Sequence, residues 1–297
     1  MKSKLAPSPY SLPIFALILL LGATIVTILL ASVDVFSKEG LGVYLMNVWD
    51  ASRGVYGGLA AIYGSLIVSG LAVLVALPLS LATSIFVNEF APKGLREVLV
   101  NLSDLMASFP TIIYGLWGLY FLAPLLKEYV MDPLHESLGF IPLFSTKPVG
   151  TCFFTAGILL AIMITPFATS IIREAYGMIP REVKEGVYAL GLGKWEVVKV
   201  SIGYIKGAIA GGFALAFGRG IGETVAVALT VGGVLNLSPS LFSPGYTIPA
   251  LIVDVFPASY FPGTQASALM ALALLLFVIG VSVTLIGKLI IRGYHEG

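Results

Sequence analysis

Two long apolar runs of this chain are separated by residues 173–206, which read REAYGMIPREVKEGVYALGLGKWEVVKVSIGYIK. This stretch carries six of the 17 Lys and Arg residues of the chain. The apolar runs on both sides hold it close to a membrane, while its own charges keep it in water. The stretch is therefore predicted to be a contact surface in the cytoplasm.

The composition is that of an integral membrane protein. Of the 297 residues, 58% are hydrophobic and only 11% are charged, and the mean hydropathy is +0.98. A soluble domain of this size would need more charge to cover its surface, so that class is excluded. The formal net charge of +1 also argues against nucleic acid as a partner, because binding a phosphate backbone requires a basic face.

Six apolar runs are long enough to cross about 30 Å of hydrocarbon, which takes about 20 helical residues each. They cover approximately residues 11–33, 59–88, 105–126, 149–172, 207–235 and 266–287. The fold class predicted is an all-α integral membrane protein with six transmembrane helices. The first run follows Lys2 and Lys4 as in a signal peptide, but it is longer than the usual apolar region of about 7 to 15 residues. We therefore expect a retained anchor helix.

Lys and Arg residues are distributed unevenly between the predicted spans. If the N-terminus is cytoplasmic, twelve of them fall inside and only Lys38, Arg53, Lys127 and Lys147 fall outside. This bias places both termini and residues 173–206 in the cytoplasm of a multi-pass protein of the cell (plasma) membrane. We divide the chain into an N-terminal anchor helix with an external loop, residues 1–57, and a transmembrane core, residues 58–297.

The predicted external segment 237–265 is rich in proline. Its prolines are Pro239, Pro244, Pro249, Pro257 and Pro262. Five prolines exclude a continuous helix, because each removes a backbone donor and clashes with the preceding turn. An ordered, partly re-entrant cap and an ordinary external linker both fit this composition, and a re-entrant backbone would have to be buried in protein or face water.

Residues 181–199 show a helical periodicity that glycine interrupts. Val183, Val187 and Leu190 recur at helical spacing. Gly191-Leu192-Gly193 then breaks the run, and an amphipathic turn with Trp195, Val198 and Ile202 follows. The pattern predicts two short helices joined by a glycine turn and lying across the membrane surface. An interfacial helix pair that only rests on lipid headgroups has the same pattern.

The charged stretch resembles the cytoplasmic EAA loop of ABC-importer permeases, the membrane subunits of binding-protein-dependent importers. The matching residues are Arg173-Glu174-Ala175, Ile179-Pro180-Arg181-Glu182-Val183-Lys184-Glu185, Tyr188-Ala189-Leu190-Gly191 and Trp195-Glu196. The resemblance implies that this loop is a coupling helix that docks in a groove of an ATPase subunit. The residues implied in this coupling are Arg181, Glu182, Glu185, Ala189, Leu190, Gly191 and Trp195.

Further motifs are similar to the PstC-type permeases of the phosphate-specific ABC importer. They are Pro78 to Phe86 followed by Glu89-Phe90-Ala91-Pro92, then Phe109 to Gly118, Gly218 to Val227 and Ser243 to Thr247. The resemblance implies a heterodimer with a PstA-type permease, two cytoplasmic ATPase subunits and an external phosphate-binding protein. A permease of the same architecture for molybdate, sulfate or an organic solute remains an alternative.

Arg219 is the one Lys or Arg that lies inside a predicted span. A cation there costs at least about 2.5 to 3.5 kcal/mol unless it is paired or hydrated. Glu223 follows one helical turn later, so the two side chains are expected to share a face and pair. Thr224 adds a hydroxyl. The three residues are either a structural, self-neutralising group or a substrate pathway in which Arg219 briefly faces an anion.

The chain lacks the sequence features of an ATPase or of a metal enzyme. It has no Gly-x-x-x-x-Gly-Lys-Ser/Thr run to hold nucleotide phosphates, and no cluster of Cys and His ligands. We therefore expect a subunit with no catalytic or metal site and no cofactor of its own, which uses ATP and Mg bound by the partner ATPase. A stand-alone secondary transporter with Arg219 and Glu223 as an ion relay is the remaining alternative.

Overall fold

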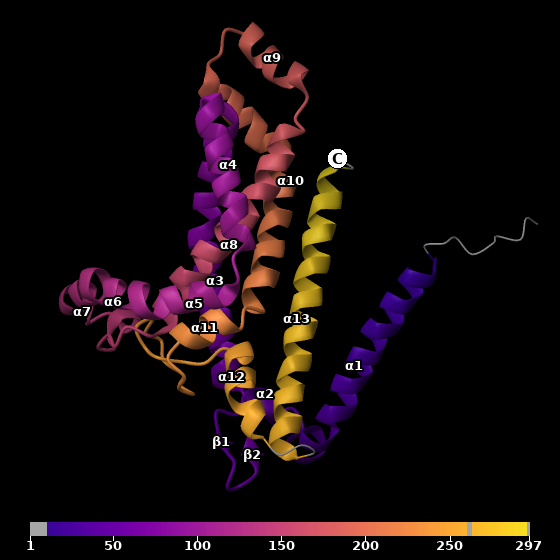
Figure 1. Cartoon of the computed structure of the whole chain (residues 1–297), viewed down its shortest axis with the longest axis vertical. Coiled ribbons are helices and arrows are strands. Elements are labelled where there is room, and N and C mark those ends of the chain that lie inside the picture. The colour runs from indigo at the N-terminus through magenta and orange to yellow at the C-terminus, as the bar shows by residue number, and fades with distance from the viewer. Residues whose placement is uncertain (1–10, 260–262, 296–297) are drawn as a thin grey trace, which may run out of the picture.

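The computed structural model describes residues 11–259 and 263–295, and most of them are helical. The long helices are α1 (Ser11–Glu39), α3 (Leu59–Ile85), α4 (Lys93–Ser108), α8 (Phe153–Gly177), α10 (Lys194–Ile221) and α13 (Thr264–His295). Shorter helices are α2 (Gly42–Leu45), α5 (Thr111–Trp117), α6 (Ala123–Leu126), α7 (Asp132–Leu138), α9 (Arg181–Ala189), α11 (Val225–Thr230) and α12 (Ile248–Val255). In Figure 1, α3, α4, α8, α10 and α13 run side by side, with α9 at one end.

Five helices are long and apolar enough to cross a membrane, and a bent pair makes a sixth candidate. The five are α1, α3 with its C-terminal π-helical turn (Phe86–Phe90), α8, α10 and α13. Four of the predicted spans overlap with these helices: the first with α1, the second with α3, the fourth with α8 and the sixth with α13. The predicted all-α membrane fold is therefore confirmed.

The third span, predicted as one run over 105–126, is wrong in its shape. α4 ends at Ser108, and the chain then bends by 94° before it continues from Thr111. Pro110 lies at the bend, and Phe109 before it has an extended backbone with ψ 138°. Proline disfavours a helical conformation in the residue that precedes it, which explains the break. The segment from α5 to α7 therefore leaves the bundle sideways (Figure 1).

The fifth span, predicted over 207–235, is also displaced. α10 begins at Lys194 and ends at Ile221, and α11 is a separate helix. The second short helix predicted on the membrane surface is therefore the first part of α10, and only α9 forms a separate short helix there. Glycines at 218, 220 and 222 weaken the helix near its C-terminal end, since glycine has a low helix propensity.

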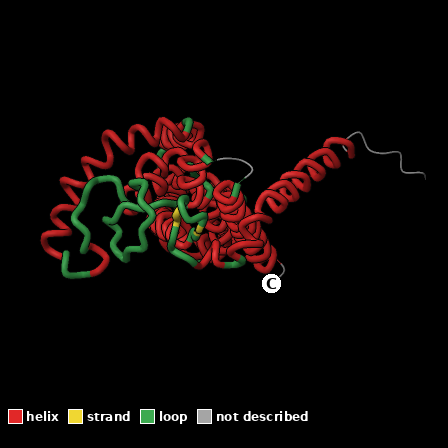
Figure 2. The backbone as a smooth tube through the Cα atoms, turned by 90° about the horizontal axis from the view of Figure 1, so that it is seen from below, coloured by secondary structure: helices red, strands yellow, loops and turns green. Residues whose placement is uncertain are grey.

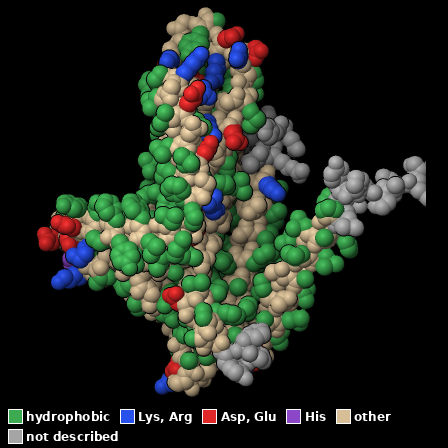
Figure 3. Space-filling model, in the orientation of Figure 1, with side chains coloured by type: hydrophobic (Ala, Val, Ile, Leu, Met, Phe, Trp, Pro, Cys, Tyr) green, Lys and Arg blue, Asp and Glu red, His purple; other side chains and the backbone are tan. Residues whose placement is uncertain are grey.

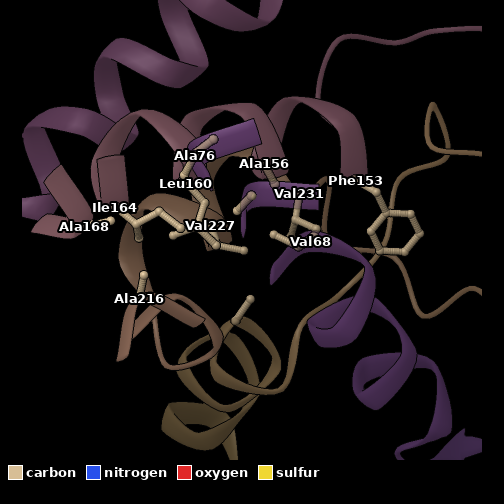
Figure 4. Packing of buried hydrophobic residues seen from close by; sticks show 13 residues of the cluster. Val68, Ala76, Phe153, Ala156, Leu160, Ile164, Ala168, Ala216, Val227 and Val231 are labelled. Carbon is tan, nitrogen blue, oxygen red and sulfur yellow. The ribbon is translucent and has the colours of Figure 1, made fainter. Parts of the chain in front are cut away.

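The centre of the bundle is packed from small side chains. Ala72, Ala76, Ala156 and Ala161 belong to a buried cluster that α3 and α8 share with α10 and α11 (Figure 4). The hydroxyl of Ser84 on α3 donates a hydrogen bond of 3.0 Å to the Thr169 carbonyl oxygen on α8. Small residues and hydroxyl hydrogen bonds are what let membrane helices approach closely without a hydrophobic driving force.

The segments predicted to be external are more ordered than a simple linker. A two-stranded antiparallel hairpin, β1 (Trp49–Asp50) and β2 (Val55–Tyr56), follows α2 and was not expected from the sequence. The proline-rich segment before α13 is packed into the protein, with Phe242 and Ile248 fully buried. This packing agrees with an ordered cap for the residues described, while Pro262 of that prediction lies outside them.

Helix α1 stands apart from the other helices for most of its length. Figures 1 and 2 show that α1 meets the bundle near its C-terminal end and that its N-terminal part points away from the other helices. At that contact the Val35 amide donates a hydrogen bond of 3.0 Å to the Ser267 hydroxyl on α13. None of the most apolar part of α1 is buried within this chain, so lipid or another protein covers it in a membrane.

Candidate functional site

Helix α9 and the first turns of α10 form the charged end of the molecule, where Lys, Arg, Asp and Glu side chains gather (Figure 3). α9 begins directly after Pro180, whose extended ψ of 140° ends the preceding segment. The glycine turn predicted after α9 is present, and Gly191 has a φ of +75°, a conformation that favours glycine. The Glu196 carboxylate then accepts a hydrogen bond of 3.2 Å from the Gly193 amide, which starts α10.

The residues predicted for coupling lie on α9, on the turn that follows it and at the start of α10. Arg181, Glu182, Glu185, Ala189, Leu190, Gly191 and Trp195 are all exposed. Two of them are large apolar side chains, since Leu190 is 77% exposed and Trp195 is 64% exposed. Of the apolar residues that recur at helical spacing here, Val187 is buried but Leu190 is not. Leu190 and Trp195 are therefore accessible to contact from outside this chain.

Helix α10 connects this surface with Arg219 without a break. Its 28 residues correspond to a length of about 42 Å at 1.5 Å per residue, which exceeds the roughly 30 Å of hydrocarbon. At least two turns of α10 therefore extend beyond the apolar layer. Arg219 follows Gly207 by about 18 Å along the helix and lies in the last turn of α10.

The Arg219 side chain is exposed within this chain. Its guanidinium lies over the Phe167 ring of α8, with 5.2 Å between the guanidinium carbon and the ring centroid. Stacking on an aromatic face stabilises a cation but does not neutralise it. Next to it, Gly218 borders a cavity of about 390 Å³ between α10 and α13.

The expected pair of Arg219 and Glu223 is not formed. No ion pair of either residue occurs in the described part of the chain. α10 ends at Ile221, and the Glu223 amide donates to the Gly220 carbonyl oxygen at 3.1 Å in the turn that follows. The prediction assumed one continuous helix, in which residues four apart share a face. Because the helix ends between the two residues, that geometry is lost.

Thr224 lies at the start of α11. Its backbone carbonyl oxygen accepts a hydrogen bond of 2.9 Å from the Ala228 amide, and its hydroxyl donates to the Gly222 carbonyl oxygen at 3.1 Å. Thr224 and Glu223 thus form the connection between α10 and α11. The three residues predicted for a pathway occupy one turn of the chain, with Arg219 on the helix and the other two beyond its end.

Comparison with known proteins agrees with this architecture. Residues 77–295 match the family model described as "Binding-protein-dependent transport system inner membrane component". The chain belongs to this family. As a component of a binding-protein-dependent system, the permease is a transport subunit rather than an enzyme, and this description sets aside the stand-alone secondary transporter.

Individual relatives cover most of the permease. It is 48% identical over 264 residues to the "Probable phosphate transport system permease protein PstC" of Methanocaldococcus jannaschii. The aligned region covers 87% of this chain and 84% of the relative. It is 40% identical to the "Phosphate transport system permease protein PstC" of Pasteurella multocida, over 92% of this chain and 86% of the relative. The protein of the same name from Haemophilus influenzae is 38% identical, over 95% of this chain and 91% of the relative.

Sequence reasoning missed one partly buried contact of the permease beneath α9. The ammonium nitrogen of Lys184 lies 2.5 Å from a carboxylate oxygen of Glu89, in the π-helical turn that ends α3. The two residues are 95 positions apart, so a single sequence carries no signal for their pairing. The one available hint was a carboxylate at the end of a long apolar run, where an unpaired charge would be costly.

Proposed function

We propose that this permease carries inorganic phosphate into the cytoplasm as one subunit of an ATP-driven ABC importer. The observation that carries the proposal is the identity of 38 to 48% to permeases named for phosphate transport, over 87 to 95% of this chain. The motifs from Pro78 to Thr247 that are similar to PstC-type permeases support the same substrate.

The partners follow from the same proposal. The permease pairs with a PstA-type permease, binds two cytoplasmic ATPase subunits that supply bound ATP and Mg, and receives phosphate from an external binding protein. Both termini are cytoplasmic in this topology. It is supported by the positive-inside bias of the loops and by the N-terminal end of α1 and the C-terminal end of α13, which are the ends of these helices that lie toward α9 (Figure 1).

α9 is the coupling helix of this proposal. Its exposed residues, together with Leu190 and Trp195, dock on the ATPase subunit, and ATP-driven closure of the ATPase dimer moves α9. The continuous α10 passes this movement toward Arg219. The membrane helices then alternate between outward and inward access, as rigid elements displaced against one another.

Arg219 is the proposed phosphate contact, with Glu223 and Thr224 beside it. An anion that crosses hydrocarbon needs a positive partner, but a fixed pair of opposite charges would hold the cation away from it. Arg219 is exposed and has no carboxylate partner among the described residues. A stacked but charged guanidinium of this kind can bind phosphate oxygens for a short time and release them.

Uptake by the reconstituted complex tests the proposal. The permease is co-expressed with its sister permease and the ATPase, reconstituted into vesicles, and supplied with the binding protein and radiolabelled phosphate. We expect ATP-dependent phosphate uptake that excess molybdate or sulfate does not abolish. Competition by either oxyanion without phosphate uptake would instead establish the alternative substrate, and transport by the permease alone would exclude an ABC importer.

A further inference from the structure

Glu89 and Lys184 form an ion pair at a position where little water reaches them. The side chain of Glu89 is 9% exposed and that of Lys184 is 26% exposed. Glu89 belongs to the π-helical turn Phe86–Phe90 at the end of α3, and Lys184 to the middle of α9. The pair therefore joins the coupling helix directly to a membrane-spanning helix that is not its neighbour in sequence.

Three further contacts surround this pair, and two of them join the same π-helical turn to the start of α10. The Lys184 ammonium lies 4.6 Å from the centroid of the buried Tyr176 ring on α8. Lys194, the first residue of α10, donates to the Glu89 carbonyl oxygen at 3.3 Å. The ring of Trp195 packs edge-on against Phe90, with 6.0 Å between the ring centroids. α9 is thus held to the turn through its middle and through the residues that follow it.

The π-helical turn also contacts α4 and α8 through Asn88. The Asn88 amide nitrogen donates to the Arg173 carbonyl oxygen at 3.5 Å on α8. Its amide oxygen accepts a hydrogen bond of 3.2 Å from Arg96 on α4. Four helices, α4, α8, α9 and α10, therefore meet one short segment whose hydrogen bonding departs from that of an α-helix. Such π-helical turns often occur at functional sites.

A partly buried ion pair such as this one adds little stability by itself, because desolvation of the two charges offsets much of their Coulomb energy. It does fix one orientation, since the ammonium and the carboxylate must meet. Apolar packing alone does little to orient α9, because Val187 is its one buried side chain and its outer face is exposed. Val183 adds a partly buried apolar contact.

We propose that Glu89 and Lys184 are positioning residues that fix α9 to the end of α3, so that movement of α9 reaches α3 and α4 as well as α8 and α10. This inference rests on the proposed role of α9 as the coupling helix. Loss of the pair leaves α9 attached to the ATPase but displaced relative to α3. ATP hydrolysis then continues while less of it is converted into transport.

The test compares phosphate carried per ATP hydrolysed in the complete complex, reconstituted into vesicles with the binding protein. Lys184→Met removes the charge and keeps an unbranched side chain, and Glu89→Gln keeps the shape of the carboxylate. We expect both variants to assemble with the ATPase and to lose at least about fivefold in this ratio, the lower limit of typical coupling between sites. Lys184→Arg keeps the positive charge, and we expect it to retain most of the wild-type ratio.

Two further variants separate positioning from a general structural effect. Lys93→Met removes an exposed ammonium at the same end of the molecule and leaves the ratio unchanged. The double reversal of Glu89→Lys with Lys184→Glu restores a pair and recovers the ratio above either single reversal. An unchanged ratio of phosphate carried to ATP hydrolysed in assembled Lys184→Met and Glu89→Gln complexes overturns the proposal. So does a ratio in the double reversal that is no higher than the ratio in either single reversal.

Failure of the proposed function is recognised separately. It appears as a wild-type complex that hydrolyses ATP but carries no phosphate. In that case the same ratio is measured with the oxyanion that the wild type does carry, because the positioning pair concerns coupling and not substrate choice.

Discussion

The charged side chains near the two ends of α10 differ in their partners. At the Lys194 end, Lys194 donates to the Glu89 carbonyl oxygen, and the Glu89 carboxylate pairs with Lys184 from α9. At the Ile221 end, Arg219 lies over an aromatic ring, and Glu223 is placed beyond the helix. Among the described residues, therefore, an ion pair forms near the Lys194 end, whereas Arg219 has no carboxylate partner.

This difference has an energetic basis. A cation in hydrocarbon costs at least about 2.5 to 3.5 kcal/mol, and a nearby carboxylate would be the simplest means of lowering that cost. The permease has such a carboxylate four residues away, yet α10 ends before it. We propose that an anionic substrate neutralises this cation in passing, and that coupling to the ATPase occurs at the other end of α10.

The largest expected effect is at the unpaired end. Arg219→Gln removes the cation that meets the anion, and we expect phosphate uptake to fall at least 100-fold, which corresponds to a barrier raised by about 2.7 kcal/mol. Assembly with the ATPase remains, because Arg219 is far along α10 from the charged end. Lys199→Gln, on the exposed side of the same helix, is the matched control and keeps normal uptake. Normal uptake by an assembled Arg219→Gln complex would refute the role of Arg219.

The next effect concerns the paired end. Leu190→Asp places a charge on a side chain that is 77% exposed, so the fold of the permease tolerates it. Burying that charge in a protein contact is costly, and we expect at least tenfold less ATPase to co-purify, as for a central interface residue. Phe140→Asp, at an 82% exposed position outside α9 and α10, leaves the amount of ATPase unchanged. Equal ATPase recovery with both variants would remove Leu190 from the coupling surface.

A smaller effect tests whether α10 acts as a continuous connection between its ends. A methyl group at Gly203 would meet nothing within 4 Å, so Gly203→Ala is expected to raise the free energy of unfolding by roughly 0.5 to 1 kcal/mol. Uptake is retained because the helix is only stiffened. Thermal unfolding in detergent and vesicle uptake measure the two quantities. Reduced uptake by a stabilised variant would mean that α10 has to bend at Gly203.

Gly212→Ala serves as the contrast to Gly203→Ala. A methyl group there would come within 3.3 Å of Ile171 on α8, a contact that requires the neighbouring side chain to move. We expect no gain in the free energy of unfolding from this variant. An equal gain at both positions would show that crowding against α8 does not limit α10.

Much of the connection between the two ends could be predicted from the sequence. Charge density and glycine spacing placed α9 and the turn at Gly191, and the apolar run after Gly207 predicted a helix that reaches Arg219. These features are local, since each depends on residues within a few turns of one another. The same local signals identified four of the six predicted spans by length and hydropathy.

The errors and omissions occurred where local signals conflict or where distant residues meet. Pro110 and the glycines up to Gly222 lie inside apolar runs, so hydropathy alone extended the third and fifth spans across the breaks. The pair of Glu89 and Lys184 depends on how α3 and α9 pack, which one sequence does not encode in any short pattern. The roles of Arg219, Glu223 and Thr224 in a pathway, and of the seven coupling residues, remain proposals.

The most direct test of the contrast between the two ends is a pair of double-mutant cycles on the free energy of unfolding in detergent. One cycle combines Glu89→Gln with Lys184→Met, and the other combines Arg219→Gln with Glu223→Gln. We predict a coupling of at least about 1 kcal/mol in the first cycle and additivity within about 0.5 kcal/mol in the second. A strong coupling between Arg219 and Glu223, or additivity of Glu89 and Lys184, would contradict the account.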